Sequence, residues 1–167
     1  MNINLELKDI YLNFLSNTNN VNNLLNYYNP NKCDLNEIIT LNLNPIPEVK
    51  IYNSQIGFYK SLDIILLEQE LSFIYFSWLI ANKNNITNAV DIGSNFGLHS
   101  LFMSKFFEKV QSYDADPNMC EILNKNIILN NSKNIHVNNL AVSNSNENQK
   151  FLVSKDNPTI NHLKDSK

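Results

Sequence analysis

The chain has 167 residues and a formal net charge of −3 at pH 7, with 13 basic residues that are all Lys. That balance argues against a dedicated nucleic-acid-binding protein, which normally shows a basic face. The sequence holds no run of about 18 apolar residues that would predict a membrane-spanning helix. The length suggests one domain with a small appendage. We therefore expect neither a nucleic acid nor a membrane among its partners.

Glycine is scarce and asparagine abundant. Only Gly57, Gly93 and Gly97 occur, whereas Asn fills 33 positions against 4 for Ala. Codon usage in an AT-rich genome is the simplest explanation, because the Asn residues are interleaved with apolar ones along the whole chain. The N-terminus lacks a basic segment followed by an apolar block, and Cys33 and Cys120 fit no metal or redox spacing. These features predict a reduced, cytoplasmic protein without a metal site.

Residues 1–60 are interpreted as an N-terminal appendage that is mostly helical. One or two short helices are expected in the first 30 residues, where Asn-rich stretches and Pro30 interrupt the apolar pattern. Pro45 and Pro47 indicate a loop. Residues 49–52 and 56–59 are then predicted to pair as a hairpin.

Residues 61–167 are interpreted as the main domain, in which strands and helices alternate. A helix is predicted over 67–82, where Trp78 recurs at helical spacing with other apolar residues and is expected in the core. After this helix, strands are expected at 87–92, 109–113, 135–140 and 150–153. Helices are expected at 98–107 and 117–130, and a turn at 93–97 joins the first of these strands to the first of these helices. This order predicts an α/β fold with a parallel sheet and right-handed crossovers.

The most informative stretch is D-I-G-S-N-F-G, which begins at Asp91. A turn between a strand and a helix of a parallel sheet lies at the carboxyl end of the strand, where ligands bind. Gly93 lacks a Cβ, so its backbone can approach a ligand closely, and Gly97 allows the helix start to pack against the strand. The helix N-terminus suits a carboxylate, whereas Asp91 suits an ammonium group. The glycine spacing differs from the G-x-G-x-x-G of dinucleotide binding.

Two more acids follow the second strand, in Y-D-A-D-P. Asp116 precedes Pro117 and is interpreted as the N-cap of the next helix. That interpretation leaves Asp114 for a ligand. A carboxylate at such a strand end can accept hydrogen bonds from the 2′- and 3′-hydroxyls of a ribose.

Three stretches in order, D-I-G-S-N-F-G-L-H-S, Y-D-A-D-P and N-N-L-A-V-S-N, resemble the FkbM family of S-adenosylmethionine-dependent methyltransferases over roughly residues 87–154. The first motif of that family is close to D-V-G-A-N-x-G-x-x-S/T. Ser94 replaces its usual Ala, and Asp114 stands where the family usually has Glu. The positions that match the first motif are Asp91, Gly93, Asn95, Gly97 and Ser100.

The resemblance implies a Rossmann-like class I methyltransferase fold with S-adenosylmethionine as cofactor. It places the methionine end at the turn, the ribose at Asp114 and the adenine beside the ends of the second and third strands. The activity it implies is methyl transfer to an oxygen of a small molecule or sugar, in which alignment supplies much of the rate. The residues it assigns to the cofactor are Asp91, Gly93, Ser94, Asn95, Gly97, Asp114, Ala115, Leu140 and Ala141.

The second half of such a fold, which in this family includes a Lys-x-Asp-x-Glu-Gly strand, has no counterpart before Lys167. We therefore expect the first half of a doubly wound sheet, with an exposed apolar edge on its first strand. Two alternatives stay open: a non-catalytic remnant or interaction module that keeps this half-fold, and a nicotinamide-dependent oxidoreductase. His99, His136 and His162 do not form a metal-ligand spacing with the acids, and His99 is expected to be structural.

Overall fold

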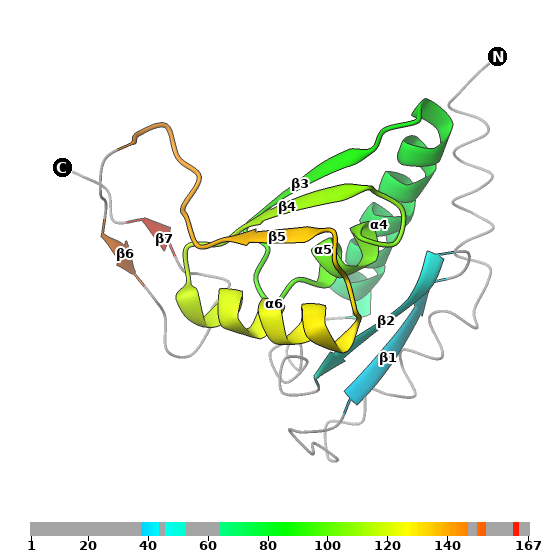
Figure 1. Ribbon diagram of the computed structural model, residues 1–167, viewed down its shortest axis with the longest axis horizontal. Helices are drawn as coiled ribbons and strands as arrows, with labels where there is room; N and C mark the ends of the chain where they lie inside the picture. The colour runs from blue at the N-terminus through cyan, green and yellow to red at the C-terminus, as the bar shows by residue number, and fades with distance from the viewer. Residues whose placement is uncertain (1–37, 44–45, 53–63, 147–149, 153–161, 164–167) are drawn as a thin grey trace. The chain divides into compact units, whose positions relative to one another are not determined.

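The computed structural model describes residues 38–43, 46–52, 64–146, 150–152 and 162–163 (Figure 1). The chain divides into two compact units, Met1–Ile80 and Ala81–Lys167. The division predicted at residue 60, and the helices predicted in the first 30 residues, lie outside the described residues. Within the described residues, no helix combines the length and the apolar character needed to cross a bilayer.

The first unit contains an antiparallel hairpin of β1 (Ile38–Leu43) and β2 (Ile46–Tyr52), in which Ile38 pairs with Tyr52. Val49 and Ile51 of β2 are buried. The predicted strand at 49–52 is thus present, but its hairpin partner lies upstream, and 56–59 lies outside the described residues. The run I-I-T-L-N-L has the β-branched and alternating character of a strand and was the overlooked signal. Pro47 lies near the start of β2, not in a loop.

The helix predicted over 67–82 is α4 (Ile64–Asn84), within which the division between the two units falls. Ile74 is fully buried. The half-buried ring of Trp78 lies against that of Tyr75, with ring centroids 5.6 Å apart. Trp78 thus packs against a neighbouring ring, but it is half-buried rather than inside the core.

The second unit is an α/β arrangement in which three parallel strands alternate with two helices (Figure 1). The elements are β3 (Asn88–Ile92), α5 (Leu98–Met103), β4 (Lys109–Tyr113), α6 (Pro117–Leu129) and β5 (Ile135–Asn138). The strand order is β3-β4-β5, with Ile92 level with Tyr113 and Tyr113 level with Asn138. The predicted fold class, a Rossmann-like parallel sheet with flanking helices, is therefore confirmed.

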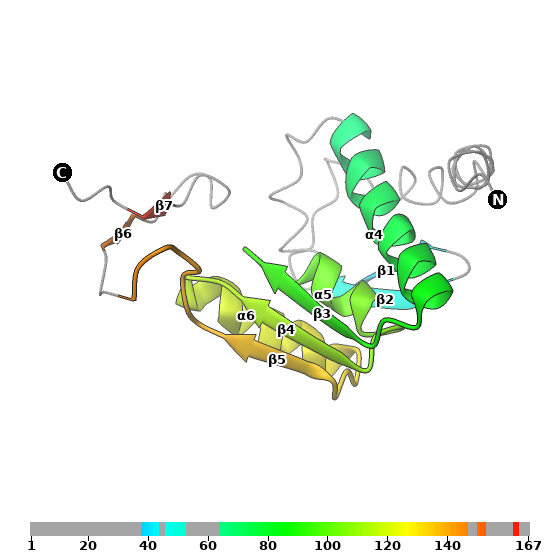
Figure 2. The same ribbon diagram turned by 90° about the horizontal axis from the view of Figure 1, so that it is seen from above.

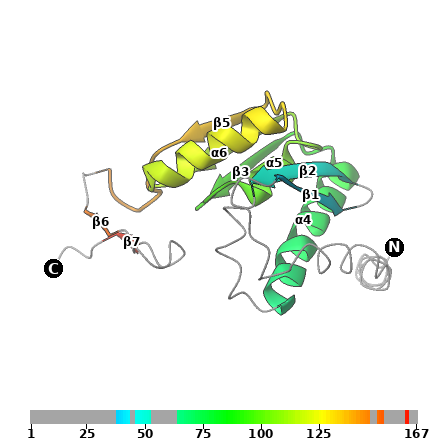
Figure 3. The same ribbon diagram turned by 90° about the horizontal axis from the view of Figure 1, so that it is seen from below.

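Both helices cover the same face of the sheet, as right-handed crossovers in one direction require (Figures 2 and 3). Fully buried side chains of α5, β4 and α6 form the core between the helices and the sheet. These side chains are Leu101, Phe102, Val110 and Leu123. On the other face, Val90 and Ile92 of β3 are 59% and 62% exposed. Parallel strands are usually buried on both faces, so the described residues leave the second face of β3 uncovered. In the order β3-β4-β5, β3 is also an edge strand, as the sequence predicts.

Several boundaries differ from the predicted ones. The helix α5 ends at Met103 rather than 107, because the Nδ2 group of Asn134 donates to the carbonyl oxygens of Ser104 (2.9 Å) and Phe107 (2.8 Å) and so replaces helical partners. The strand β5 ends at Asn138 rather than 140. The predicted fourth strand is the two-residue β6 (Phe151–Leu152), which pairs antiparallel with β7 (His162–Leu163) and is not part of the parallel sheet.

Asparagine takes backbone conformations that most residues avoid. The non-glycine residues with positive φ among the described ones are Asn85 (53°), Asn95 (50°) and Asn131 (51°). Asn tolerates the left-handed region better than other non-glycine residues. Asn131 follows the C-cap residue Asn130 of α6, at the position where a left-handed residue commonly ends a helix. In a chain with three glycines, part of the Asn excess thus has a structural use.

Candidate functional site

The carboxyl ends of the three parallel strands are joined by hydrogen bonds. The backbone N–H groups of Gly93 and Ser94 both donate to the Tyr113 carbonyl oxygen, at 2.9 and 3.0 Å. The N–H of Asp114 donates to the Asn138 carbonyl oxygen at 3.1 Å. The Asn139 Nδ2 group donates to the Asp114 carbonyl oxygen at 2.9 Å. The turn after β3 and the ends of β4 and β5 therefore form one connected edge, where ligands of such sheets bind.

The two glycines of the turn have different surroundings. Both have positive φ, 75° at Gly93 and 93° at Gly97. A Cβ at Gly93 would meet nothing within 4 Å, so this part of the backbone is open to a ligand. A Cβ at Gly97 would lie 2.1 Å from Leu123 Cδ1, and Leu123 is fully buried on α6. Gly97 thus permits close packing, as predicted, but its tight neighbour is a helix residue rather than a strand residue.

Asp114 is engaged more fully than the sequence predicts. Its Oδ2 accepts a hydrogen bond from the Asn95 N–H at 2.7 Å, and its Oδ1 accepts one from the Asp116 N–H at 2.8 Å. The carboxylate that the sequence leaves for a ligand thus also holds two backbone N–H groups of the protein. Each carboxylate oxygen keeps a second lone pair, so the side chain can still accept hydrogen bonds from hydroxyl groups. The two backbone bonds fix its orientation at the strand end.

Asp91 is buried on the face of the sheet that the helices cover. Its side chain is 8% exposed, and its Oδ2 accepts a short hydrogen bond from Ser100 Oγ on α5. The hydroxyl oxygens of Ser100 and Ser112 are 2.6 Å apart, and both residues are fully buried. Within the described part of the chain, Asp91 Oδ1 accepts no hydrogen bond and is not shut off from solvent. One oxygen of this carboxylate is thus anchored, and the other is available near the carboxyl end of β3.

Ser94 holds a buried hydroxyl in the turn. The residue is 6% exposed, and its Oγ has no hydrogen-bond partner among the described residues. An unsatisfied buried hydroxyl costs roughly 1–3 kcal/mol. Such local costs are typical of functional sites. The side chain of Asn95, the next residue, accepts a hydrogen bond from the Phe96 N–H at 2.8 Å, which closes the turn locally.

The predicted N-cap of α6 is confirmed. Asp116 Oδ1 accepts a hydrogen bond from the Asn118 N–H at 2.9 Å, and Pro117 occupies the first helical position. Cys120, one turn later, is 5% exposed and belongs to the buried core. Burial raises the pKa of the Cys120 thiol, and the negative charge of Asp114 raises it further. The thiol is therefore a packing group rather than a nucleophile.

The residues that the resemblance assigns to the adenine are near this edge along the chain but differ in exposure. Ala115 is half-buried between the two acids. Leu140 and Ala141 follow β5 and are exposed, Leu140 by 61%. The Leu140 N–H donates to the Asn138 carbonyl oxygen at 2.9 Å, which turns the chain just after the strand.

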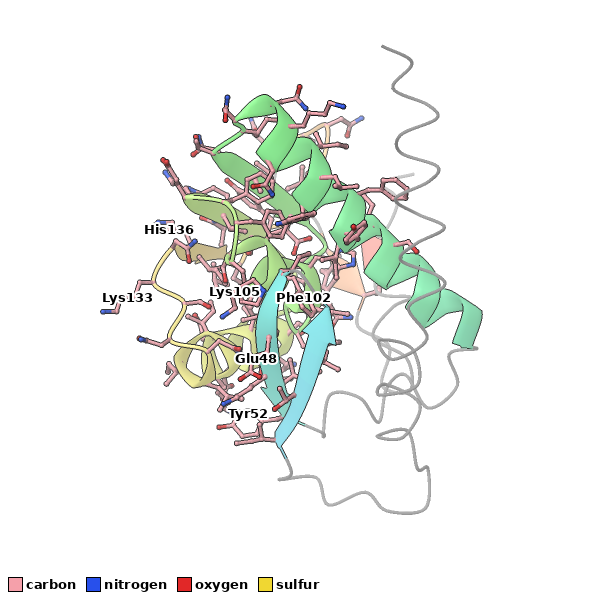
Figure 4. The ribbon with its side chains drawn as sticks, turned by 90° about the vertical axis from the view of Figure 1, so that its right-hand side faces the viewer. Glu48, Tyr52, Phe102, Lys105, Lys133 and His136 are labelled. Carbon is pink, nitrogen blue, oxygen red and sulfur yellow. The ribbon has the colours of Figure 1, made fainter. Side chains whose placement is uncertain are left out.

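The histidines contribute no metal centre among the described residues, where no three His, Cys, Asp or Glu side chains are grouped to hold an ion. His136 is exposed on β5, and Figure 4 shows it on the outside of the unit, as it does Lys133. Figure 4 also shows Phe102, which lies among the packed side chains. His162 belongs to β7, outside the parallel sheet.

Comparisons with known proteins add little. No family model matches the chain, and no curated protein matches it significantly. Among solved structures, the YcgJ protein from Bacillus subtilis is similar at 18% identity with a TM-score of 0.38. That similarity covers 41% of this chain and 29% of the YcgJ chain, so the present chain spans less than a third of that protein's length. The FkbM resemblance therefore stays a prediction.

Sequence reasoning missed three residues of this edge. Asn138 and Asn139 lie in the N-N-L-A stretch, and their position directly after a strand of a parallel sheet was an available signal. Ser112 was missed because it lies in the mixed strand K-V-Q-S-Y, where a lone serine belongs to no motif. A small polar residue at a fully buried strand position needs a hydrogen-bond partner, and that requirement is the signal that could have identified it.

Proposed function

We propose that this chain forms the cofactor-binding part of an S-adenosylmethionine-dependent methyltransferase. The observation that carries the proposal is the convergence of Asp91, the open backbone of Gly93 and the fixed carboxylate of Asp114 at one sheet edge. An available carboxylate oxygen suits the ammonium group of an amino acid, and a second carboxylate suits a ribose diol. S-adenosylmethionine carries both groups.

Each residue would act on a different part of the cofactor. Asp91 Oδ1 would accept a hydrogen bond from the ammonium group, and the backbone at Gly93 would allow the methionine chain to approach closely. Asp114 would accept hydrogen bonds from the ribose hydroxyls while its bonds to Asn95 and Asp116 hold it in place. Ala115, Leu140 and Ala141 would border the adenine. The residues present thus fit the group.

The bound cofactor would supply an electrophilic methyl group on a sulfonium. The sulfur would leave as a neutral thioether, which needs no prior protonation. The protein's part is to hold that methyl in line with the acceptor, because alignment supplies much of the rate. The acceptor proposed is an oxygen of a small molecule or sugar. The acceptor hydroxyl loses its proton as the bond forms, so a nearby base assists. We propose a cytoplasmic location and no nucleic-acid or membrane partner.

A nicotinamide-dependent oxidoreductase is the weaker enzymatic alternative. It would use Asp114 for the ribose in the same way. Its pyrophosphate, however, would lie at the turn close to the Asp91 carboxylate, and like charges repel. The single open glycine also departs from the G-x-G-x-x-G pattern.

The proposal is tested by isothermal titration of the full chain with S-adenosylhomocysteine, and in parallel with NADH. Saturable binding of S-adenosylhomocysteine with weaker binding of NADH is the expected result. Tighter binding of NADH would favour the oxidoreductase. Folded protein that binds neither would overturn the proposal and favour a non-catalytic interaction module. Methyl transfer itself is then assayed with a radiolabelled methyl donor and a panel of sugars and small alcohols.

A further inference from the structure

Ser112 lies in the interior of β4, level with Asp91 of β3. It is fully buried, as is Ser100 of α5. A buried strand position of this kind normally holds Val or Ile. A hydroxyl there is costly unless it is hydrogen-bonded, and its partner is Ser100 Oγ at 2.6 Å. The three side chains of Ser112, Ser100 and Asp91 thus connect two strands and a helix just below the carboxyl edge of the sheet.

The direction of the hydrogen bonds follows from the number of protons. Ser100 has one hydroxyl proton, and it donates that proton to Asp91 Oδ2. The contact between the two serines therefore uses the proton of Ser112, with Ser100 Oγ as acceptor. The result is a one-way chain of donors from Ser112 through Ser100 to the carboxylate. Successive hydrogen bonds of this kind polarise and strengthen one another.

The chain of donors ends on one oxygen only. Asp91 Oδ2 is occupied, whereas Oδ1 accepts no hydrogen bond within the described residues and keeps contact with solvent, although the residue as a whole is only 8% exposed. A ligand that covers this edge would remove that contact with solvent. An ammonium group placed against Oδ1 would then supply a charge-assisted hydrogen bond in its place.

We infer that Ser112 is a positioning residue, which acts through Ser100 to hold Asp91 so that Oδ1 receives the ammonium group of an amino-acid-bearing ligand. The inference rests on the proposed function, because the ligand is the methionine part of the cofactor. Ser112 itself touches no ligand. Its effect is confined to the part of the ligand that carries the ammonium group.

Two ligands separate this role from a general structural one. S-adenosylhomocysteine carries the ammonium group, and 5′-methylthioadenosine has the same nucleoside without it. In the full chain, Ser112→Ala is expected to weaken S-adenosylhomocysteine about tenfold, in line with the loss of one hydrogen bond that supports a charged group. Binding of 5′-methylthioadenosine is expected to change by less than about twofold. Ser112→Thr keeps the hydroxyl. It should therefore retain most of the difference in affinity that the wild-type protein shows between the two ligands.

Ser132→Ala is the matched control, because Ser132 is also buried and its hydroxyl also contacts a serine hydroxyl, that of Ser104 at 3.1 Å. It should leave the affinities for both ligands within about twofold. Equal weakening of both ligands by Ser112→Ala, or no weakening of either, would overturn the inference.

A measurement without ligand separates this inference from the proposed function. The carboxyl ¹³C resonance of Asp91 should shift in Ser112→Ala and stay in place in Ser132→Ala, because only the first change removes a donor from its hydrogen-bonded chain. A resonance that stays in place in both variants contradicts the positioning role, whatever the protein binds. If the resonance shifts and the wild-type chain binds neither ligand, the proposed function fails while the hydrogen-bonded chain stands.

Discussion

The backbone N–H of Asn95 donates to Asp114 Oδ2 at 2.7 Å, so the carboxylate at the end of β4 holds the glycine turn that follows β3. Asn95 itself has a left-handed backbone, with φ of 50°. The same carboxylate accepts the Asp116 N–H and thereby supports the start of α6. A single side chain thus connects the turn, the second strand and the second helix. A ligand that contacts Asp114 would therefore also affect the conformation of the turn.

Replacement of Asp114 by Asn tests this connection in the protein without ligand. The amide keeps one acceptor oxygen but presents an NH₂ group to the second N–H, so one of the two backbone bonds is lost. We expect the free energy of unfolding to fall by about 1.5–3 kcal/mol, the range for hydrogen bonds to charged groups. The amide proton that loses its acceptor, that of Asn95 or that of Asp116, should also exchange faster with solvent.

Asp116→Asn is the control for that change, because Asn caps a helix about as well as Asp. It should alter stability by only a few tenths of a kcal/mol. Chemical denaturation and amide exchange measured by NMR check both variants. Unchanged exchange at both Asn95 and Asp116 in Asp114→Asn would show that the carboxylate holds neither the turn nor the start of α6.

Alanine at the two turn glycines should have unequal effects. Gly97→Ala places a Cβ against buried Leu123 and keeps a positive φ, so we expect a loss of more than about 2 kcal/mol from strain and overpacking. Gly93→Ala meets open space and should lose only about 1–2 kcal/mol from its backbone conformation. Thermal unfolding of the two variants measures the difference.

The double variant Gly97→Ala/Leu123→Ala provides a check on the cause. If the clash with Leu123 is responsible, the double variant will be less destabilised than the sum of the two single changes. Additive losses would mean that backbone strain alone explains the effect at Gly97.

Ser94→Ala should stabilise the protein without ligand. The change removes a buried hydroxyl that has no partner among the described residues, and it introduces the residue usual at this place in the FkbM motif. We expect the free energy of unfolding to rise by about 1 kcal/mol. Urea denaturation measures it, and a decrease would mean that the hydroxyl makes a stabilising hydrogen bond in solution.

The raised pKa of the Cys120 thiol predicts that the stability of the protein changes with pH in the alkaline range. Burial, and then the charge of Asp114, raises the pKa of the folded thiol above its ordinary value of 9.0. The folded state therefore holds the thiol proton more tightly than the unfolded state does. Its contribution to stability is fully present below about pH 9 and is lost as pH rises through the higher folded value.

The difference in free energy of unfolding between wild type and Cys120→Ala isolates this contribution, because other titrating groups cancel. That difference should be constant from pH 7 to about pH 9 and should shrink above it. A difference that stays constant to pH 11 would contradict the raised pKa.

Much of the second unit could be predicted from its sequence. Periodic apolar residues identified the strands and helices from residue 87 onward, and Asp116-Pro117 marked a helix start that the structure confirms. These signals are local, so a single sequence contains them. The end of α5 could not be predicted, because it depends on Asn134, which lies far along the chain and takes the last carbonyl groups.

The candidate site shows the same limit. The sequence identified Asp91 and Asp114 as acids at strand ends, but not that Ser100 and Ser112 anchor the first or that Asn95 occupies the second. Those contacts depend on strand register and helix position, which residue types alone do not specify. Likewise, the sequence predicts the strand at 49–52. It does not show that this strand pairs with β1, which precedes it, rather than with a segment that follows it.

The most direct test of the proposed site is an NMR titration of the full ¹⁵N-labelled chain with S-adenosylhomocysteine. Saturable shifts are expected in the amide resonances of residues 93–97, 114–116 and 138–141, at the carboxyl edge of the parallel sheet. They should be much smaller in Asp114→Ala. Folded protein whose amide resonances do not move, or move only away from this edge, would contradict the account.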